Sequence, residues 1–492
     1  MLTGSVWLIG LRWAVRLTGV ISTLVLARLL SPSDFGVVAI AMIVVGMFEV
    51  LSWNGQELAI IRHDTPTRDH YNTAWTISAL IGVVIAAGII LVAPLTKNYF
   101  HDDRAIAVMR WLAIRPLLSG LENVGTVDFQ RDLRFDRVFG YNFYAKVIAF
   151  FVTITAAALL RNYWALVIGT LTGQSARTIL SYLLHPYRPA FSLSKRVEIW
   201  SFSIWSFTRA VGSYFITQID VIAVGGTNGS AAMGRYTVAK DVASSPVDEL
   251  NEPVSTVLFP VMARYQSDPV QLRDLYLRTL GWAAIIGASA GPGVMMVAQD
   301  MIRLILGAKW YDTIPLIGWL ALTAGASALT NSSYTLLDIL GIPHVGARLQ
   351  WIRVLLLAAL LLPIAWFSHS LMAIAQARLA VSLIFIPTLL LSVGVYVSVS
   401  WKQYLAVLWR PILAGFVMCA VLYGINIVVP PIAPLRLAID VFLGAVIFGL
   451  ALLALWSWSG RPASPERDIL TLYEGLRARL VLTRDRGSKR AQ

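Results

Sequence analysis

Apolar runs long enough to cross a lipid bilayer recur along the whole chain. A helix needs about twenty mainly apolar residues to span the hydrocarbon layer, and its backbone polar groups must be hydrogen-bonded within the segment itself. About fourteen such runs can be placed in this sequence. The sequence therefore predicts an all-α, polytopic membrane protein with about fourteen transmembrane helices. The expected spans are residues 9–29, 35–53, 72–95, 105–123, 139–160, 164–184, 203–225, 233–258, 277–298, 313–333, 350–367, 371–396, 410–430 and 436–458.

The composition excludes an ordinary soluble protein. Hydrophobic residues make up 57% of the chain and charged residues 14%, and the mean hydropathy is +0.69. The loops between the expected spans are too short for a folded catalytic domain, so we do not expect an enzyme. No basic segment precedes the first apolar run, and no small-residue cleavage site follows it before Arg28. We therefore expect the first run to be retained as a helix rather than removed as a signal peptide.

The first expected helix carries two arginines inside an apolar stretch. Residues four apart share a helix face, so Arg12 and Arg16 lie in line with Gly19 and Thr23, while leucines and valines cover the rest. A charge within a span costs roughly a few kcal/mol or more unless it faces protein or water, which makes such residues candidates for a substrate path. The alternative is that both side chains extend to the cytoplasmic headgroups. For Arg12 both interpretations stay open. Arg16 lies one turn deeper in the span, which favours the interpretation that it faces a water-filled cavity.

The seventh expected span repeats features of the first. Arg209 lies early in its helix as Arg12 does, and the helix after the next turn opens with Met233-Gly234 where the first repeat has Phe35-Gly36. Parallel repeats of six helices place a transporter's binding site at the interface between the halves, which rock against each other in alternating access. The repeat therefore predicts a substrate site between two pseudo-symmetric six-helix lobes.

The chain is accordingly divided into four parts. We expect one lobe in residues 1–200, a second in 201–400, two additional helices in 401–460 and a basic cytoplasmic tail in 461–492. In the tail, Ser464 is expected to cap a helix that has Pro465 at its first position and acidic residues in its first turn. The periodicity that follows is amphipathic, which is typical of a helix on the lipid surface; docking onto a partner protein is the alternative.

Ionisable residues inside the expected spans are the candidates for function. Glu49 and Asp220 are carboxylates in apolar surroundings, where desolvation favours the protonated form, so they are candidates for proton coupling. For Asp220 the alternative is a structural pair with a basic neighbour. Lys146 and Asp338 are further isolated charges. The candidates for binding an anionic substrate are Arg12, Arg16, Arg177, Arg209 and Arg378.

Metal and nucleic-acid functions are not indicated. Cys419 is the only cysteine and lies in an apolar run, which excludes disulfides and cysteine metal sites. The net charge of +13 follows the membrane-proximal loops and does not indicate nucleic acid. We expect no metal and no cofactor, and we interpret the histidines as interfacial, because none is paired at metal-ligand spacing. The six are His63, His70, His101, His185, His344 and His369.

Four segments resemble a known transporter family. They are ARLLSPSDFGVVAIA (27–41), QRDLRFDR (130–137), VLFPVMARYQSD (257–268) and LGAKWYDTIPLIGWLAL (306–322). Together they are similar to the polysaccharide transporter family, the Wzx-type flippases of lipid-linked oligosaccharides, whose superfamily also holds multidrug and toxic-compound extrusion transporters and the lipid II flippase. The resemblance covers nearly the whole chain.

The resemblance implies a fourteen-helix fold of two six-helix lobes and two further helices in the bacterial inner membrane. It also implies a flippase that moves a polyprenyl-pyrophosphate-linked sugar repeat unit to the outer leaflet for exopolysaccharide or surface polysaccharide assembly. The implied partners are this lipid-linked oligosaccharide, membrane lipid, and a polysaccharide polymerase with its export machinery. The family has no short catalytic signature, so no site residue is carried over from it.

Two other functions are alternatives to this one. A cation-coupled drug or metabolite antiporter of the extrusion type needs a small amphipathic pocket with carboxylates, and the cationic residues here argue against organic cations as cargo. A membrane glycosyltransferase or polymerase is disfavoured, because the loops are short and no paired-carboxylate motif lies beside a large outer loop.

The placement of lysine and arginine predicts the topology. Most of those in the loops fall on one side when the N-terminus is cytoplasmic, and the basic tail lies on the same side. Reporter fusions after Gly460 and within 185–200 should therefore report the cytoplasm, while fusions near Asn228 and Lys309 should report the periplasm. A periplasmic C-terminus would refute this topology, because it requires an odd number of spans.

Overall fold

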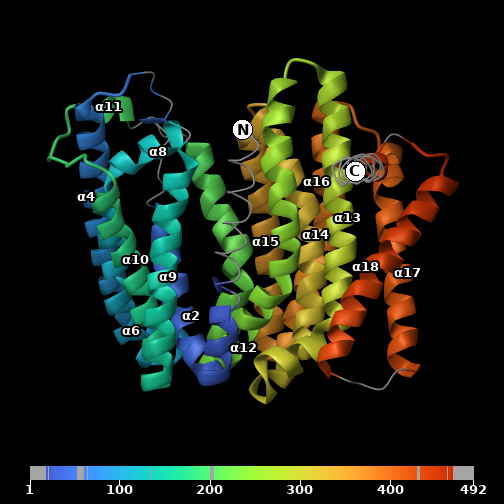
Figure 1. Ribbon diagram of the computed structural model, residues 1–492, viewed down its shortest axis with the longest axis horizontal. Coiled ribbons are helices and arrows are strands. Elements are labelled where there is room, and N and C mark those ends of the chain that lie inside the picture. Colours follow the sequence, from blue (N-terminus) through green and yellow to red (C-terminus); the bar gives the residue numbers. More distant parts are fainter. Residues whose placement is uncertain are drawn as a thin grey trace, which may run out of the picture. The chain divides into compact units, whose positions relative to one another are not determined.

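The computed structural model describes residues 18–19, 21–51, 60–61, 63, 65–132, 134–199, 204–428, 433–462 and 464–468. These ranges contain helices and turns and no strand, which confirms the all-α prediction (Figure 1). The long helices are α2 (Pro32–Leu51), α4 (Arg68–Val92), α9 (Phe135–Leu160), α10 (Trp164–Leu184), α12 (Ile204–Arg264), α13 (Pro269–Met301), α14 (Ile314–Ile339), α15 (Pro343–Ser368), α16 (Leu371–Val397), α17 (Trp401–Val428) and α18 (Ala433–Trp458).

The helices coincide with the expected spans. Every span from 35–53 onward overlaps a helix, and nine helices in the described part of the chain are long and apolar enough to cross a membrane. The total of about fourteen stays a prediction, since much of the first span lies outside the described residues. The shorter elements are α5 (Thr96–Phe100), α6 (Arg104–Leu112), α7 (Ile114–Gly120), α8 (Val127–Arg131), α11 (Arg196–Ile199), the 3₁₀ segments η1 (Ala93–Leu95), η2 (Val124–Thr126) and η4 (Ala308–Thr313), and the π-helical turn η3 (Ile302–Leu306).

Three expected spans differ from simple helices. Span 105–123 is broken into α6 and α7, because Pro116 has no N–H to bond the carbonyl of Leu112, where α6 ends. The seventh and eighth spans form one helical run, α12, which is interrupted at Gly229 with φ 79° and ψ 179°. This left-handed φ suits glycine, which has no Cβ to clash, so Gly229 makes the turn that the sequence predicts between the two spans.

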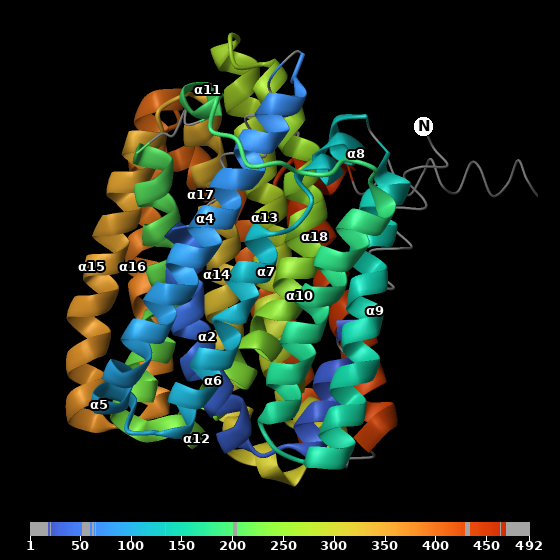
Figure 2. The ribbon, with the colours of Figure 1, turned by 90° about the vertical axis from the view of Figure 1, so that its left-hand side faces the viewer.

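The described chain forms two compact units. Unit 1 consists of Met1–Val238, Ile305–Asp312 and Gln350–Ile374. In it, α9 packs along α10, α4 along α7 and α2 along α6, as Figure 2 shows. Most of α15 also belongs to this unit, where the Trp351 indole N–H donates to the carbonyl of Thr208 on α12 over 3.1 Å. The division into lobes at residue 200 stays a prediction.

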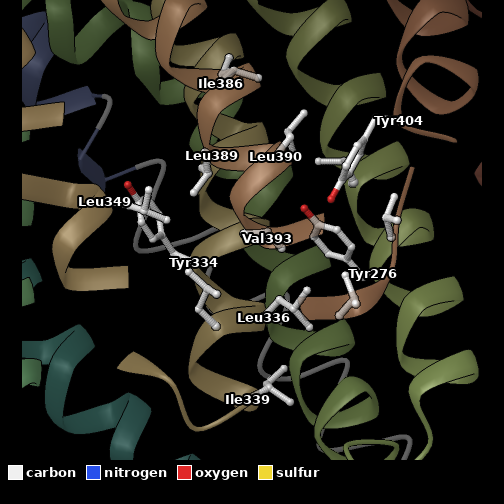
Figure 3. Packing of buried hydrophobic residues seen from close by; sticks show 14 of the residues in the cluster. Tyr276, Tyr334, Leu336, Ile339, Leu349, Ile386, Leu389, Leu390, Val393 and Tyr404 are labelled. Carbon is white, nitrogen blue, oxygen red and sulfur yellow. The ribbon is translucent and has the colours of Figure 1, made fainter. Parts of the chain in front are cut away.

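Unit 2 consists of Ala239–Leu304, Thr313–Leu349 and Ala375–Gln492. Its core is an apolar cluster around two tyrosines, Tyr276 and Tyr404, whose rings meet edge to face at 6.3 Å (Figure 3). The Tyr276 hydroxyl lies 2.9 Å from that of Ser333, which satisfies this polar group in the core. The two additional helices α17 and α18 pack on α13 through a second cluster that contains Met418 and Phe448.

The start of the tail is fixed onto unit 2. Residues 465–468 are helical after Ser464, at the position where the sequence predicts a helix start. The Glu466 carboxylate lies 3.0 Å from the guanidinium of Arg410 on α17, and both side chains are almost fully buried. Asp468 pairs with Arg278 on α13. The amphipathic part of the predicted tail helix lies outside the described residues.

Two glycines that the repeat places in equivalent positions let α2 and α12 touch backbone to backbone in unit 1. A Cβ on Gly36 would lie 1.7 Å from the carbonyl oxygen of Ser230, and a Cβ on Gly234 would lie 1.9 Å from that of Pro32. Each glycine thus contacts the residue four positions before the other, which is the pattern of a local two-fold axis. This contact fits the predicted relation between the two repeats.

We expect Gly234→Ala to destabilise the protein by about 3 kcal/mol or more, because the rigid backbone cannot yield to the new methyl group. The matched control is Gly449→Ala on α18, where nothing lies within 4 Å of the new Cβ. The control should gain up to about 1 kcal/mol from helix propensity. Thermal unfolding of the purified proteins in detergent measures both, and equal midpoints for the two variants would contradict the close contact.

Candidate functional site

A polar cavity of about 290 Å³ lies inside unit 1, between α2, α4, α7 and α10. We refer to it as the polar cavity. Apolar side chains line only part of it, and hydroxyl, amide and charged groups line the rest. These polar residues are Glu49, Ser78, Arg115, Ser119, Glu122, Asn123, Thr126, Gln174 and Arg177.

One ion pair of the polar cavity joins α2 to α7. The Glu49 carboxylate lies 3.3 Å from the Arg115 guanidinium, and the two side chains are 27% and 28% exposed. Both groups are therefore largely withdrawn from solvent. Removal of either charge would leave the other one uncompensated, which is strongly destabilising. Glu49, a predicted coupling residue, lies in a cavity and has a fixed basic neighbour.

A second group of polar side chains surrounds Glu122. Its carboxylate lies 3.4 Å from the Arg177 guanidinium and accepts hydrogen bonds from the Gln174 amide at 2.5 Å and the Tyr141 hydroxyl at 2.6 Å. The Arg177 guanidinium also lies 5.3 Å from the centre of the Tyr141 ring. The two carboxylates and two guanidiniums balance, so the polar cavity is lined by fixed dipoles and paired charges of zero net charge.

Among the predicted site residues, the structure brings Glu49 and Arg177 together in the polar cavity. Arg209 and Asp220 lie on α12 in unit 1, and Arg378 lies almost buried on α16 in unit 2. Asp220 is fully buried, and the Tyr236 hydroxyl donates to its carboxylate over 3.0 Å. Arg12 and Arg16 lie outside the described residues, and the role of the five arginines in substrate binding stays a prediction.

The described part of the first helix meets a lysine. The Thr23 hydroxyl donates to the carbonyl of Gly19 over 3.1 Å, and a Cβ on Gly19 would lie 3.7 Å from the Lys146 ammonium of α9. Both residues belong to the polar face predicted for this helix. Lys146 is exposed and makes no ion pair with any residue that the structure describes. A cation is thus available beside the polar face of the first helix.

Arg115 and Glu122 are not among the site residues predicted from the sequence. Both lie in the expected span 105–123, so their charge inside an apolar run was the signal that could have found them. Their partners could not be read from the sequence, because Glu49 and Arg177 lie on other helices more than fifty residues away.

Three residues that could hold a metal by type gather at the start of α4. His63, His70 and Glu198 bring their ligand atoms within 4.8 Å of one another. However, the Nδ1 atoms of the two histidines accept the backbone N–H groups of Thr65 and Thr67, at 3.2 and 3.1 Å. In the neutral rings the proton is therefore on Nε2, the atom that faces Glu198, which suits a hydrogen bond rather than a metal bond.

The same glutamate helps to fix the segment between α10 and α12 on α4. The Lys195 ammonium and the His70 ring both bond its carboxylate, and they hold the pKa of Glu198 below its ordinary value. Earlier in the same segment, the Tyr187 hydroxyl donates to the Asn72 side chain over 2.6 Å. The segment that leads toward α12 is therefore bound along one helix of unit 1.

Comparisons with known proteins extend over most of the chain. Residues 25–315 match the model of the family described as polysaccharide biosynthesis protein. The lipopolysaccharide biosynthesis protein WzxC of Escherichia coli (strain K12) is 23% identical over 437 residues, which cover 85% of this chain and 87% of that protein. The teichuronic acid biosynthesis protein TuaB of Bacillus subtilis (strain 168) is 24% identical over 400 residues, covering 79% and 82%.

The fold is shared with solved transporters. The lipid II flippase MurJ, in an inward closed conformation, superimposes with a TM-score of 0.75 at 13% identity, covering 93% of this chain and 99% of that one. An inward-facing multidrug resistance MATE family transporter of the MOP superfamily gives a TM-score of 0.63 at 13% identity, covering 78% and 94%. At these identities the likeness concerns the fold.

Proposed function

Because the chain belongs to the family of polysaccharide biosynthesis proteins, we propose that it flips polyprenyl-pyrophosphate-linked oligosaccharide repeat units from the inner to the outer leaflet of a bacterial inner membrane. The repeat units would serve the assembly of exopolysaccharide or surface polysaccharide. The observation that carries the proposal is the similarity, over most of the chain, to proteins named for lipopolysaccharide and teichuronic acid biosynthesis. The helical membrane fold shared with flippase and transporter structures supports it.

The chemistry of this cargo sets what the protein must supply. Its diphosphate and glycan cannot enter hydrocarbon without a large desolvation cost, whereas its lipid tail need not leave the hydrocarbon. Cationic groups in a polar path between the lobes would hold the diphosphate. Lys146 beside the first helix and Arg209 on α12 support such a path, and Arg12, Arg16, Arg177 and Arg378 are its further candidates.

Alternating access is the proposed mechanism. The backbone contact of Gly36 and Gly234 supports it, because these small residues let equivalent helices of the two repeats approach closely. In this mechanism the two six-helix lobes rock about the substrate. A polysaccharide polymerase and its export machinery are the proposed partners on the outer side.

An antiporter of the multidrug and toxic-compound extrusion type is the alternative. The observation that favours it is a carboxylate within a polar cavity, Glu49, although Arg115 already pairs with this carboxylate. A deletion strain separates the two functions. Lipid-linked repeat units that accumulate on the cytoplasmic side support the flippase, whereas normal polymer with increased drug sensitivity supports the antiporter.

We expect Arg16→Ala and Arg209→Ala to abolish polymer export while protein level and membrane insertion stay normal. A guanidinium can bond two phosphate oxygens at once, so lysine at either position should restore export only in part. Polymer export measured beside membrane protein level checks this. The matched control is Lys97→Ala, which removes an exposed cation that pairs with Asp103 at 3.0 Å.

The alternative role of these arginines predicts a different result. If these arginines only anchor helices at the headgroups, lysine substitutes fully and alanine lowers the amount of protein. Normal export by both alanine variants would remove the two arginines from the substrate path without affecting the family assignment.

Glu49 and Asp220 are the proposed sites of proton coupling. We expect Glu49→Gln and Asp220→Asn to lose the dependence of export on the proton gradient. For Glu49 the double variant Glu49→Gln/Arg115→Gln removes the unpaired guanidinium that the single variant leaves. If the double variant exports with normal gradient dependence, Glu49 serves only to pair with Arg115.

A further inference from the structure

Two carboxylates share one guanidinium where α13, α17 and α18 pack together in unit 2. Asp300 lies near the end of α13, and Arg436 and Asp440 lie one turn apart on α18. The Arg436 Nε atom is 3.2 Å from Asp300 Oδ2 and 3.6 Å from Asp440 Oδ2. The two aspartates are only 6% and 3% exposed. Neither the polar cavity nor the predicted coupling residues belong to this cluster.

The charges of this cluster do not balance when both carboxyl groups are ionised. The groups that face Asp440 are Arg436, Asp300 and the amide of Asn426 on α17. One guanidinium compensates one carboxylate, so the second carboxylate is an excess negative charge in a site almost closed to water. Such a charge costs several kcal/mol unless it is paired or neutralised.

Unsatisfied atoms identify where the imbalance is located. Asp440 Oδ2, Asn426 Oδ1 and Arg436 Nε are buried, and none of the three makes a hydrogen bond with the described residues. An ionised carboxylate offers only acceptors, whereas a protonated carboxyl group has one O–H donor. A proton on Asp440 would therefore remove the excess charge and provide a donor for the amide oxygen of Asn426.

We propose that Asp440, Asp300, Arg436 and Asn426 form a proton-binding site, in which Asp440 carries an exchangeable proton. Uptake forms one O–H bond on the Asp440 carboxyl with a proton from water, and release returns that proton to water. The cluster lies at the ends of the spans Pro269–Leu306 and Arg436–Trp458, so the path to the aqueous boundary is short. The proton couples the packing of α18 on α13 to pH.

A metal ion suits this position less well than a proton. Arg436 Nε already lies within 3.6 Å of both carboxylates, so an ion bound between them would face a fixed positive charge at close range. A proton needs no such space and carries no ligand shell.

The site can be tested on the purified full-length protein by infrared difference spectroscopy across a pH titration. The wild type should show a C=O stretching band of a protonated carboxyl group, which disappears as the pH rises. Asp440→Asn removes the group and should lose the band. Asp300→Asn leaves one carboxylate for one guanidinium, so Asp440 should ionise and the band should be lost here as well.

Two further variants sharpen the result. Arg436→Gln removes the only cation of the cluster, so the band should increase. Asp312→Asn is the control, because this exposed carboxylate pairs with Arg235 at 3.2 Å and should not affect the band.

If Asp440→Asn and Asp300→Asn both keep the wild-type band, the cluster binds no proton. A wild type without the band, whose melting temperature responds to Na⁺ through Asp300, would also overturn the proposal. Asp300→Asn reports on the same proton of Asp440. The proposal can therefore be tested even if Asp440→Asn does not fold.

Discussion

A charged group among membrane helices is stable only where an opposite charge or water compensates it, and this constraint shapes both units. In unit 1, the four charges around the polar cavity form two pairs, of which one joins α2 to α7 and the other joins α10 to the turn that follows α7. In unit 2, Arg410 and Glu466 pair so closely that the start of the tail is drawn onto α17. Each pair therefore determines which surfaces of the chain face each other. Apolar residues that face lipid do not determine this by themselves.

Glycines provide the second requirement of such a bundle. Lipid tails are as apolar as leucine, so helices in a membrane associate through close packing rather than through hydrophobic burial. Gly36 and Gly234 let α2 and α12 touch in unit 1, and Gly287 and Gly325 do the same for α13 and α14 in unit 2. In both places, the missing side chains bring backbone atoms of two helices into contact.

These features fit a protein that moves a polar, anionic group past lipid. The polar cavity is charge-balanced, so it suits coupling or hydration better than binding a diphosphate, which needs a surplus of positive charge. Lys146 and Arg209 are cations of unit 1 that stay candidates for this role.

The sequence by itself determined the positions of the helices and the family. Runs of apolar residues mark the spans, because a backbone in lipid must bond to itself within a helix. The gap between the spans 203–225 and 233–258 predicted the turn that the structure places at Gly229. The sequence also singled out Glu49 and Arg177 as charges inside spans. Only the tertiary structure decided which groups face them. Ion pairs act over a few ångströms, and Arg115 and Glu122 come within that range through the packing of helices far apart in the chain.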